Sequence, residues 1–168
     1  GQLGMYFALA ARRMGYRVMV LDPDANCPAG RAADEHLVAN YDDAGALQTM
    51  SARCAAVTCE FENVPAQSLR LLAQHTRVAP AADAVAIAQD RIAEKRFLNG
   101  MGLATADFTI IETASDLEAV TQFPGILKRS REGYDGKGQV TVRNASDLAA
   151  AWDSLRSEEH TSELQSHS

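Results

Sequence analysis

The stretch that decides the fold reads Lys128-Arg129-Ser130-Arg131-Glu132-Gly133-Tyr134-Asp135-Gly136-Lys137-Gly138-Gln139. It lies between two segments, 125–128 and 139–142, whose apolar and β-branched residues are typical of strands. Gly133, Gly136 and Gly138 allow backbone conformations in which successive N–H groups turn toward an anion. The pattern therefore predicts a glycine-rich loop that joins two antiparallel strands and closes over a phosphate group.

The loop is not a Walker P-loop, because that motif needs G-x-x-x-x-G-K-[ST] followed by a helix. Lys128 and Lys137 add the positive charge that a phosphate site requires. A glycine-rich hairpin with a solvated surface is the structural alternative. Asp135 also has two interpretations, because Asp before Gly suits a tight turn and a carboxylate there could accept a proton from an amine.

The composition is typical of a globular chain, with 168 residues, 46% hydrophobic content and a net charge of -6. This acidic balance argues against nucleic-acid binding and favours small-molecule partners. No apolar run approaches the roughly 20 residues of a membrane span, and no signal-peptide pattern opens the chain. Cys27, Cys54 and Cys59 lack metal-ligand spacing, so we expect reduced thiols, no zinc site and a cytoplasmic location.

Residues 1–80 alternate between helix and strand patterns. Four apolar residues recur at helical spacing: Leu3, Phe7, Ala10 and Met14. They predict an amphipathic helix over 3–14 that ends at Gly15, followed by a buried strand at 17–21. A turn at Gly1, this helix and a strand ending at Asp22 predict a β-α-β unit whose first strand has been cut away.

Further strands are predicted at 34–38, 55–59 and 77–79, with helices at 43–52 and 65–73. Glu60 and Glu62 directly follow one of these strands. Because ligands collect beyond the carboxyl ends of parallel strands, both carboxylates are candidates to bind a polyol or an amine. Alternatively, one of them caps the helix that Pro65 opens. His36 and His75 stand alone in the sequence and are interpreted as surface or packed residues.

The pattern changes near Pro80, where we place a domain boundary. The region 81–155 predicts two helices with caps at Asp83 and Asp90, a strand at 108–111, and a capped helix over 115–121. The two strands around the loop and a helix over 146–155 complete a small α+β unit. Residues 156–168 resemble the conceptual translation of a sequencing adapter, and their polar, aperiodic sequence predicts a non-native tail that does not pack.

Six short motifs occur in an informative order: Gly1-Gln2-Leu3-Gly4, Leu21-Asp22-Pro23-Asp24, Ala33-Asp34-Glu35-His36, Glu60-Phe61-Glu62-Asn63-Val64-Pro65, Gln89-Asp90-Arg91-Ile92-Ala93-Glu94-Lys95 and Gly133-Tyr134-Asp135-Gly136-Lys137-Gly138-Gln139. Up to about Leu155, the chain resembles the 5-(carboxyamino)imidazole ribonucleotide synthases of purine biosynthesis, which are ATP-grasp enzymes. The resemblance implies an α/β fold: a Rossmann-like pre-ATP-grasp domain without its first strand, then the α+β N-terminal part of an ATP-grasp domain.

The resemblance also implies a reaction. ATP phosphorylates bicarbonate, and the resulting carboxyphosphate delivers carbon dioxide to the amine of aminoimidazole ribonucleotide. ATP and Mg²⁺ are the implied cofactors, and the full-length protein is expected to be a homodimer. The magnesium ligands would lie in a C-terminal portion outside this chain, with no metal ligand within it, so we expect an inactive fragment.

The implied site residues follow from the matching motifs. ATP would contact Arg91, Lys128, Gly133, Tyr134, Asp135, Gly136, Lys137, Gly138 and Gln139. The ribonucleotide would contact Gln2, Leu3, Glu60 and Tyr134. Asp135 and Lys137 would be catalytic, inside a lid that protects carboxyphosphate from water. Family members often carry a glycine at the position of Glu132, which could stiffen the lid or repel phosphate here.

Three alternatives stay open at this point. A formate-dependent glycinamide ribonucleotide transformylase, also an ATP-grasp enzyme, would share the N-terminal turn and the region of Arg91. A nicotinamide-dependent oxidoreductase would use the first β-α-β unit and Asp22, but it gives the glycine-rich loop no role. The third alternative is a non-catalytic nucleotide-binding fragment.

Overall fold

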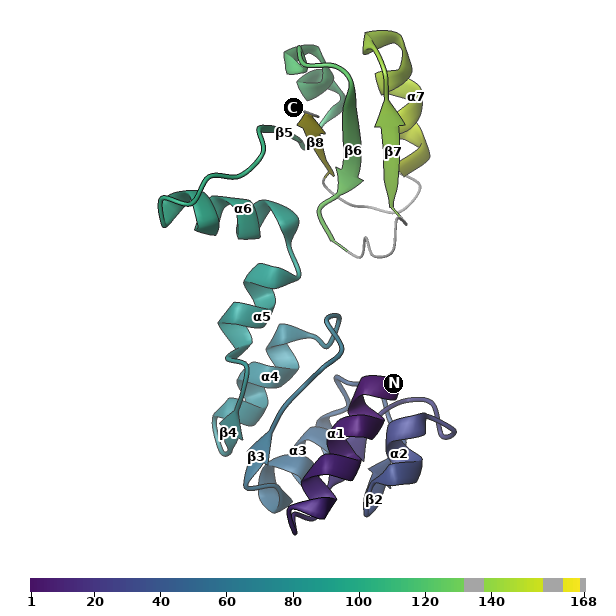
Figure 1. The fold of residues 1–168 in the computed structure, drawn as a ribbon, viewed down its shortest axis with the longest axis vertical. Helices are drawn as coiled ribbons and strands as arrows, with labels where there is room; N and C mark the ends of the chain where they lie inside the picture. The colour runs from purple at the N-terminus through teal and green to yellow at the C-terminus, as the bar shows by residue number, and fades with distance from the viewer. Residues whose placement is uncertain (132–137, 156–161, 167–168) are drawn as a thin grey trace. The chain divides into compact units, whose positions relative to one another are not determined.

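The computed structural model describes residues 1–131, 138–155 and 162–166 (Figure 1). The chain divides into two compact units, Gly1–Ala86 and Ile87–Ser168. Within the described residues, no helix is both long and apolar enough to span a lipid bilayer. All three cysteines are free thiols, as predicted.

The first unit consists of helices around two parallel strand pairs. Its helices are α1 (Gln2–Arg13), α2 (Pro28–Ala32), α3 (Ala44–Arg53) and α4 (Ala66–Ala73), with α5 (Ala82–Ala88) at its end. Strand β1 (Met19–Leu21) pairs with β2 (Glu35–Leu37), and β3 (Ala56–Val57) pairs with β4 (Arg77–Val78). Parallel pairing through helical crossovers is the arrangement that the alternating sequence pattern predicts.

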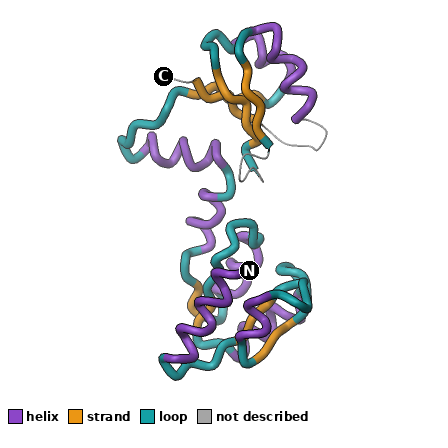
Figure 2. The backbone as a smooth tube through the Cα atoms, turned by 45° about the vertical axis from the view of Figure 1, so that its right-hand side comes forward, coloured by secondary structure: helices purple, strands orange, loops and turns teal. Residues whose placement is uncertain are grey.

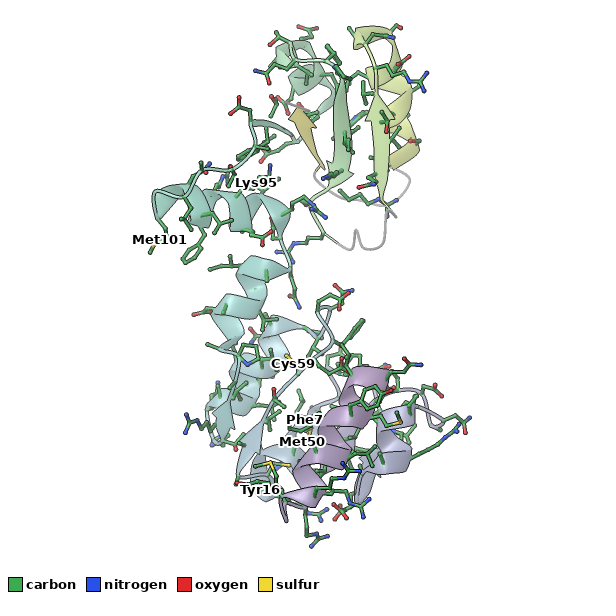
Figure 3. The ribbon with its side chains drawn as sticks, viewed as in Figure 1. Phe7, Tyr16, Met50, Cys59, Lys95 and Met101 are labelled. Atoms are coloured by element: carbon green, nitrogen blue, oxygen red, sulfur yellow. The ribbon has the colours of Figure 1, made fainter. Side chains whose placement is uncertain are left out.

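Both strand pairs share one apolar core with α3 and α4. Its buried members are Leu47, Met50, Val57 and Leu72, and residues of β1, β2 and β4 pack against them. Burial of each large side chain contributes roughly 1.5–3 kcal/mol, so this core holds the strand ends in place. Met50 is labelled in Figure 3.

The start of α1 lies between the carboxyl ends of the two strand pairs. The backbone nitrogen of Gly1 is 3.8 Å from a carboxylate oxygen of Asp22, which follows β1. It is also 3.8 Å from a carboxylate oxygen of Glu60, which follows β3. Among the described residues, β1 and β3 do not pair with each other.

The predicted apolar face of α1 is not its buried face. Leu3, Phe7 and Met14 are 67%, 52% and 73% exposed, whereas Ala8 is completely buried. Helix α1 meets α2 through small residues, because a Cβ added at Gly4 would lie 3.2 Å from the Cβ of Ala29. The spacing of large apolar residues predicted the wrong buried face, because the contact between α1 and α2 is made by small residues.

The second unit is a sheet covered by a helix. Helix α6 (Arg91–Gly100) precedes β5 (Phe108–Ile111), the 3-10 helix η1 (Ala114–Ala119), β6 (Gly125–Arg129), β7 (Gln139–Val142), α7 (Ala145–Leu155) and β8 (Ser162–Ser166). The strands form one antiparallel sheet in the order β5-β8-β6-β7 (Figure 2). Helix α7 packs on β6 and β7, and Trp152 is buried in the core with Ile111, Leu127 and Val142.

The prediction that the tail does not pack is wrong for 162–166. Strand β8 pairs with both β5 and β6, with Leu164 opposite Thr109 on one side and opposite Leu127 on the other. Backbone N–H and C=O groups of a strand edge pair with any extended segment, so an aperiodic side-chain pattern does not prevent pairing. The non-native origin of 156–168 stays a prediction, and 156–161 and 167–168 lie outside the described residues.

Two predicted helix starts also differ from the structure. The helix expected over 115–121 is η1, and its cap is Thr113, whose N–H donates to Asp116 Oδ2 at 2.7 Å. Asp83 lies within the first turn of α5, and its Oδ1 accepts from Arg70 Nη2 at 2.8 Å. Thr113 and Asp116 form a capping box, a local pattern that could have identified the start of η1. The partner of Asp83 is 13 residues away in the chain, and a local pattern does not reveal it.

Candidate functional site

The carboxyl ends of β1, β2 and β3 place polar side chains around the start of α1. Asp22 follows β1, Tyr41 follows β2 after a short loop, and Glu60 follows β3. We call Gly1, Asp22, Tyr41 and Glu60 the carboxyl-end site. Ligands of open α/β sheets bind at such an edge. The structure thus brings together the predicted residues Glu60 and Gln2, the latter being the first residue of α1.

Glu60 is held close to the first turn of α1. A Cβ added at Gly4 would lie only 2.9 Å from Glu60 Oε1, a separation that real Cβ atoms essentially never show. A side chain at this position would therefore displace the carboxylate or the helix. The carboxylate ends a flexible side chain and could move aside, so the tighter restriction on Gly4 is the Cβ of Ala29, 3.2 Å from the added Cβ.

Glu60 does not serve as the cap of α4. The N-cap of α4 is Pro65, which makes no side-chain capping hydrogen bond. The Glu60 carboxylate lies instead beside the backbone nitrogen of Gly1. The cap interpretation is therefore wrong for Glu60, and its role in ligand binding stays a prediction.

Tyr41 belongs to this site and was missed by sequence reasoning. Its hydroxyl donates a hydrogen bond to the Asp22 carboxylate, and its ring lies 5.8 Å from the ring of Phe61, tilted by 42°. Burial first, and then the Asp22 charge, raise the pKa of Tyr41, so the phenol stays protonated at neutral pH. The same strand-end rule that identified Glu60 could have identified Tyr41, but the loop after β2 separates it from the strand.

His36 contacts the backbone of Asp22, and Cys27 contacts His36. His36 Nε2 lies 3.2 Å from the Asp22 carbonyl oxygen and 3.7 Å from Cys27 Sγ. Gly30 N–H donates to Cys27 Sγ at 3.1 Å, and a side chain at Gly30 would collide with the His36 ring. His36 is thus a packed residue, as predicted.

A second candidate site lies at the base of the predicted loop. Arg91, the first residue of α6, donates its backbone N–H to the Ser130 carbonyl at 2.8 Å. Arg131 Nε donates to Asp90 Oδ2 at 3.1 Å. Asp90 Oδ1 accepts the N–H groups of Ile92 and Ala93 at 3.0 Å each, so the predicted cap is confirmed. These bonds fasten the start of α6 to the chain that leaves β6.

The strands on either side of the loop form the predicted antiparallel hairpin. Lys128 lies opposite Gln139 in the register of β6 and β7, and Arg129 N–H donates to the Gly138 carbonyl at 2.9 Å. We call Arg91, Lys128, Arg129, Ser130 and Arg131 the hairpin-base site, in which four of five residues are cationic. The remaining loop predictions, Gly133, Tyr134, Asp135, Gly136 and Lys137, lie outside the described residues.

Lys95 is a buried cation that sequence reasoning did not assign to a role. Its Nζ donates to the Ala106 carbonyl at 3.3 Å and lies 4.5 Å from the centre of the Phe108 ring. Ala106 precedes β5 and Phe108 is its first residue, so Lys95 ties α6 to the sheet through a hydrogen bond and a cation–π contact. Figure 3 labels Lys95 on α6.

Comparisons with known proteins agree with the division of the chain into two units. Residues 1–89 match the family model described as the ribonucleotide synthetase preATP-grasp domain, and 96–164 match the ATP-grasp domain. The N5-carboxyaminoimidazole ribonucleotide synthase of Staphylococcus aureus is 37% identical over 166 residues, covering 97% of this chain and 44% of that protein. The enzyme of the same name from Brucella melitensis is 42% identical over 153 residues, covering 89% of this chain and 42% of that protein.

Solved structures of enzymes with the same activity in their names also match this chain. The Staphylococcus aureus N5-carboxyaminoimidazole synthetase complexed with ADP matches with a TM-score of 0.93 at 35% identity, covering 99% of this chain and 45% of that one. The Aspergillus clavatus synthase in complex with ADP and 5-aminoimidazole ribonucleotide matches with a TM-score of 0.82 at 26% identity, covering 97% and 44%. The chain therefore spans less than half the length of these relatives.

Proposed function

Because this chain belongs to the ribonucleotide synthetase pre-ATP-grasp family, we propose that it is the N-terminal part of an ATP-dependent carbon–nitrogen ligase. The complete enzyme carboxylates 5-aminoimidazole ribonucleotide with bicarbonate in purine biosynthesis. It works in the cytoplasm as a homodimer, and the chain by itself lacks the parts needed for turnover. The ADP and ribonucleotide bound by the Aspergillus clavatus relative support this choice of substrates.

The observation that carries the proposal is the fastening of α6 to the hairpin. The bonds Arg91–Ser130 and Asp90–Arg131 bring the first residue of α6 to the chain that continues from Lys128. Two segments far apart in sequence thus supply cations at the base of a glycine-rich loop. Positioned cations are the main requirement of phosphoryl transfer, because charge spreads over the transferred phosphate oxygens.

In the proposed reaction, a bicarbonate oxygen attacks the γ-phosphorus of ATP and the bond to the ADP oxygen breaks. The carboxyphosphate formed loses phosphate, and the freed carbon dioxide receives the amine nitrogen of the ribonucleotide. The proton released from that nitrogen passes to Asp135. Arg91 and Lys128 hold the ATP phosphates, while the loop 133–139 covers them and excludes water.

Magnesium would neutralise charge on the phosphate oxygens when bound. Among the described residues, no group of three or more His, Cys, Asp or Glu side chains could hold a metal ion. The resemblance to ATP-grasp enzymes, and not this absence, is the reason to propose that the magnesium ligands lie in the part of the enzyme beyond this chain.

The carboxyl-end site would receive the ribonucleotide. A unit negative charge about 4 Å from a carboxylate is repelled by about 4 kcal/mol at an effective dielectric constant of about 20. Asp22 and Glu60 therefore face hydrogen-bond donors of the ligand, such as ribose hydroxyls or the amine. The first-turn N–H groups of Gln2 and Leu3 have no partner within the helix and suit the acceptor oxygens of the ligand.

The test replaces the matching region of the Staphylococcus aureus synthase by residues 1–155 of this chain. We expect this chimera to release ADP only when bicarbonate and aminoimidazole ribonucleotide are both present. Lys128→Met should weaken ATP binding about tenfold or more in calorimetry, because one cation is lost from the phosphate site. Arg143→Met makes the same change of charge at an exposed position and serves as the control.

Three outcomes would contradict the proposal. ADP release that depends on formate and glycinamide ribonucleotide would instead identify the transformylase. A folded chimera that binds ATP without turnover of either substrate set would support a non-catalytic role for this part. Equal ATP affinity in Lys128→Met and Arg143→Met would remove Lys128 from the site.

A further inference from the structure

We propose that Tyr41 is a positioning residue of the carboxyl-end site, which holds the segment carrying Glu60 against the start of α1. The inference rests on the proposed function, in which the Glu60 carboxylate binds the ribonucleotide. Tyr41 makes two contacts in different directions, one through its hydroxyl to Asp22 and one through its ring to Phe61. It thereby links the ends of β1, β2 and β3.

The Glu60 segment, residues 59–64, is anchored to the core at its two ends, where Cys59 and Val64 pack against the cluster of Leu69, Ala82 and Val85. It forms a bend and turn between β3 and α4, and the Val64 N–H to Phe61 carbonyl bond within it is long, at 3.4 Å. Phe61 is 40% exposed, so packing covers only part of its ring. Because Phe61 is the next residue after Glu60, the Tyr41–Phe61 ring contact limits where the Glu60 carboxylate can lie.

The hydroxyl contact fixes the other end of the link. The Asp22 side chain is 14% exposed, and its Oδ1 accepts the Asp24 N–H at 2.9 Å while Oδ2 faces Gly1. The Tyr41 hydroxyl therefore donates to a carboxylate that is already held by its own loop. A protonated phenol also avoids a third negative charge beside Asp22 and Glu60, which matches the raised pKa of Tyr41.

The experiment measures steady-state kinetics of the chimera with Tyr41→Phe, which keeps the ring and removes the hydroxyl. We expect the KM for aminoimidazole ribonucleotide to rise roughly tenfold, the scale for losing a hydrogen bond to a charged group. The KM for ATP and kcat should change less than about twofold. Tyr41→Leu removes both contacts and should raise the ribonucleotide KM further. Tyr16→Phe, at a tyrosine that is 64% exposed, is the matched control.

A lower melting temperature with an unchanged ribonucleotide KM would mean that Tyr41 only stabilises the fold, and would overturn the proposal. Equal increases in the KM for ATP and for the ribonucleotide would overturn it too. The two hypotheses are separated by Glu60→Gln in the same chimera. If Glu60→Gln raises the ribonucleotide KM and Tyr41→Phe does not, the proposed function stands and the role of Tyr41 fails.

A second measurement uses this chain itself and needs no activity. The carbon-13 resonance of the Glu60 carboxyl, assigned with Glu60→Gln, should shift in Tyr41→Phe and stay unchanged in Tyr16→Phe. An inactive chimera would refute the proposed function, and this resonance would then still decide whether Tyr41 positions Glu60. An unshifted resonance overturns the inference.

Discussion

The carboxyl-end site and the hairpin-base site carry charges of opposite sign. In the first unit, Asp22 and Glu60 lie 3.8 Å from the backbone of Gly1, and the protonated Tyr41 keeps the cluster from gaining a further negative charge. In the second unit, Arg91 and Lys128 accompany two further arginines. The first site suits a ligand rich in hydrogen-bond donors, and the second suits phosphate groups.

The two sites also differ in construction. The carboxyl-end site collects residues from separate parallel strands, so each side chain comes from a different loop. The hairpin-base site uses neighbouring antiparallel strands, with Lys128 directly opposite Gln139, and one capped helix. Local sequence therefore specifies most of the second site, whereas the first depends on how the parallel strands are arranged.

The largest expected effect concerns Asp135. It is an acidic residue in the sequence between Lys128 and Lys137, and so an exception to the contrast between an acidic and a cationic site. In the chimera, Asp135→Asn should lower carboxylation by roughly 10²-fold or more with ATP binding retained, because Asn keeps the turn preference but cannot accept a proton. Product formation by coupled assay and ATP binding by calorimetry check this. Full carboxylation activity would reduce Asp135 to a turn residue.

Deletion of 156–168 should affect the two units differently. It removes β8 from between β5 and β6, and we expect a loss of about 2 kcal/mol or more from the second unit, since each backbone hydrogen bond contributes about 0.5–1.5 kcal/mol. Hydrogen exchange should accelerate in β5 and β6 and stay the same in β1 and β2. Leu164→Pro, which disturbs pairing but keeps the tail, should act in the same direction. Unchanged exchange in β5 and β6 would show that β8 contributes no stability.

Two substitutions of Asp90 distinguish its role as a helix cap from its ion pair with Arg131. Asp90→Ala removes the acceptor for the Ile92 and Ala93 N–H groups and should cost about 1 kcal/mol. Asp90→Asn keeps an acceptor and removes only the pair with Arg131, which is 54% exposed, so it should cost a few tenths of a kcal/mol at most, about the value of a surface pair. Urea unfolding measures both. Equal losses would mean that the ion pair, not the cap, holds the start of α6.

The smallest effects are opposite dependences of stability on pH. The backbone N–H of Thr113, then that of Glu112, lower the pKa of Asp116, so its stabilisation is present above the ordinary Asp value and is lost as pH falls through the lowered pKa. The raised pKa of Tyr41 gives the reverse: its stabilisation is present below the ordinary Tyr value and is lost as pH rises through the raised pKa.

Melting curves from pH 2 to pH 11 test these directions. The stability difference between the unmodified chain and Asp116→Asn should shrink in acid, and the difference for Tyr41→Phe should shrink in alkali. The same pH dependence in both variants would contradict the assignments.

The second unit illustrates how far sequence alone reaches. Glycine spacing between two apolar segments predicted the β6–β7 hairpin, and Asp90 before a helical pattern predicted the cap of α6. Asp43 likewise caps α3 as predicted, with Oδ1 accepting from Ala46 N–H at 2.8 Å. These features depend on residues close together in the chain, whose conformational preferences act before any tertiary contact forms.

Other features were decided by tertiary contacts. The role of Tyr41 depends on Asp22 and Phe61, which follow other strands, and Lys95 is buried because Ala106 and Phe108 meet it from the next strand. The burial of Ala8 instead of Leu3 or Phe7 depends on the close approach of α2. Strand β8 depends on backbone groups that carry no signal in the side-chain pattern.

By itself, then, the sequence determined the order of helices and strands, the hairpin, the caps of α3 and α6, and the motifs that identified the family. Only the tertiary structure decided which face of α1 is buried, where the tail pairs, and which side chains surround Gly1. The physical reason is that turn and cap preferences are local, whereas the burial of a side chain and the charge around it are set by residues that only folding brings together.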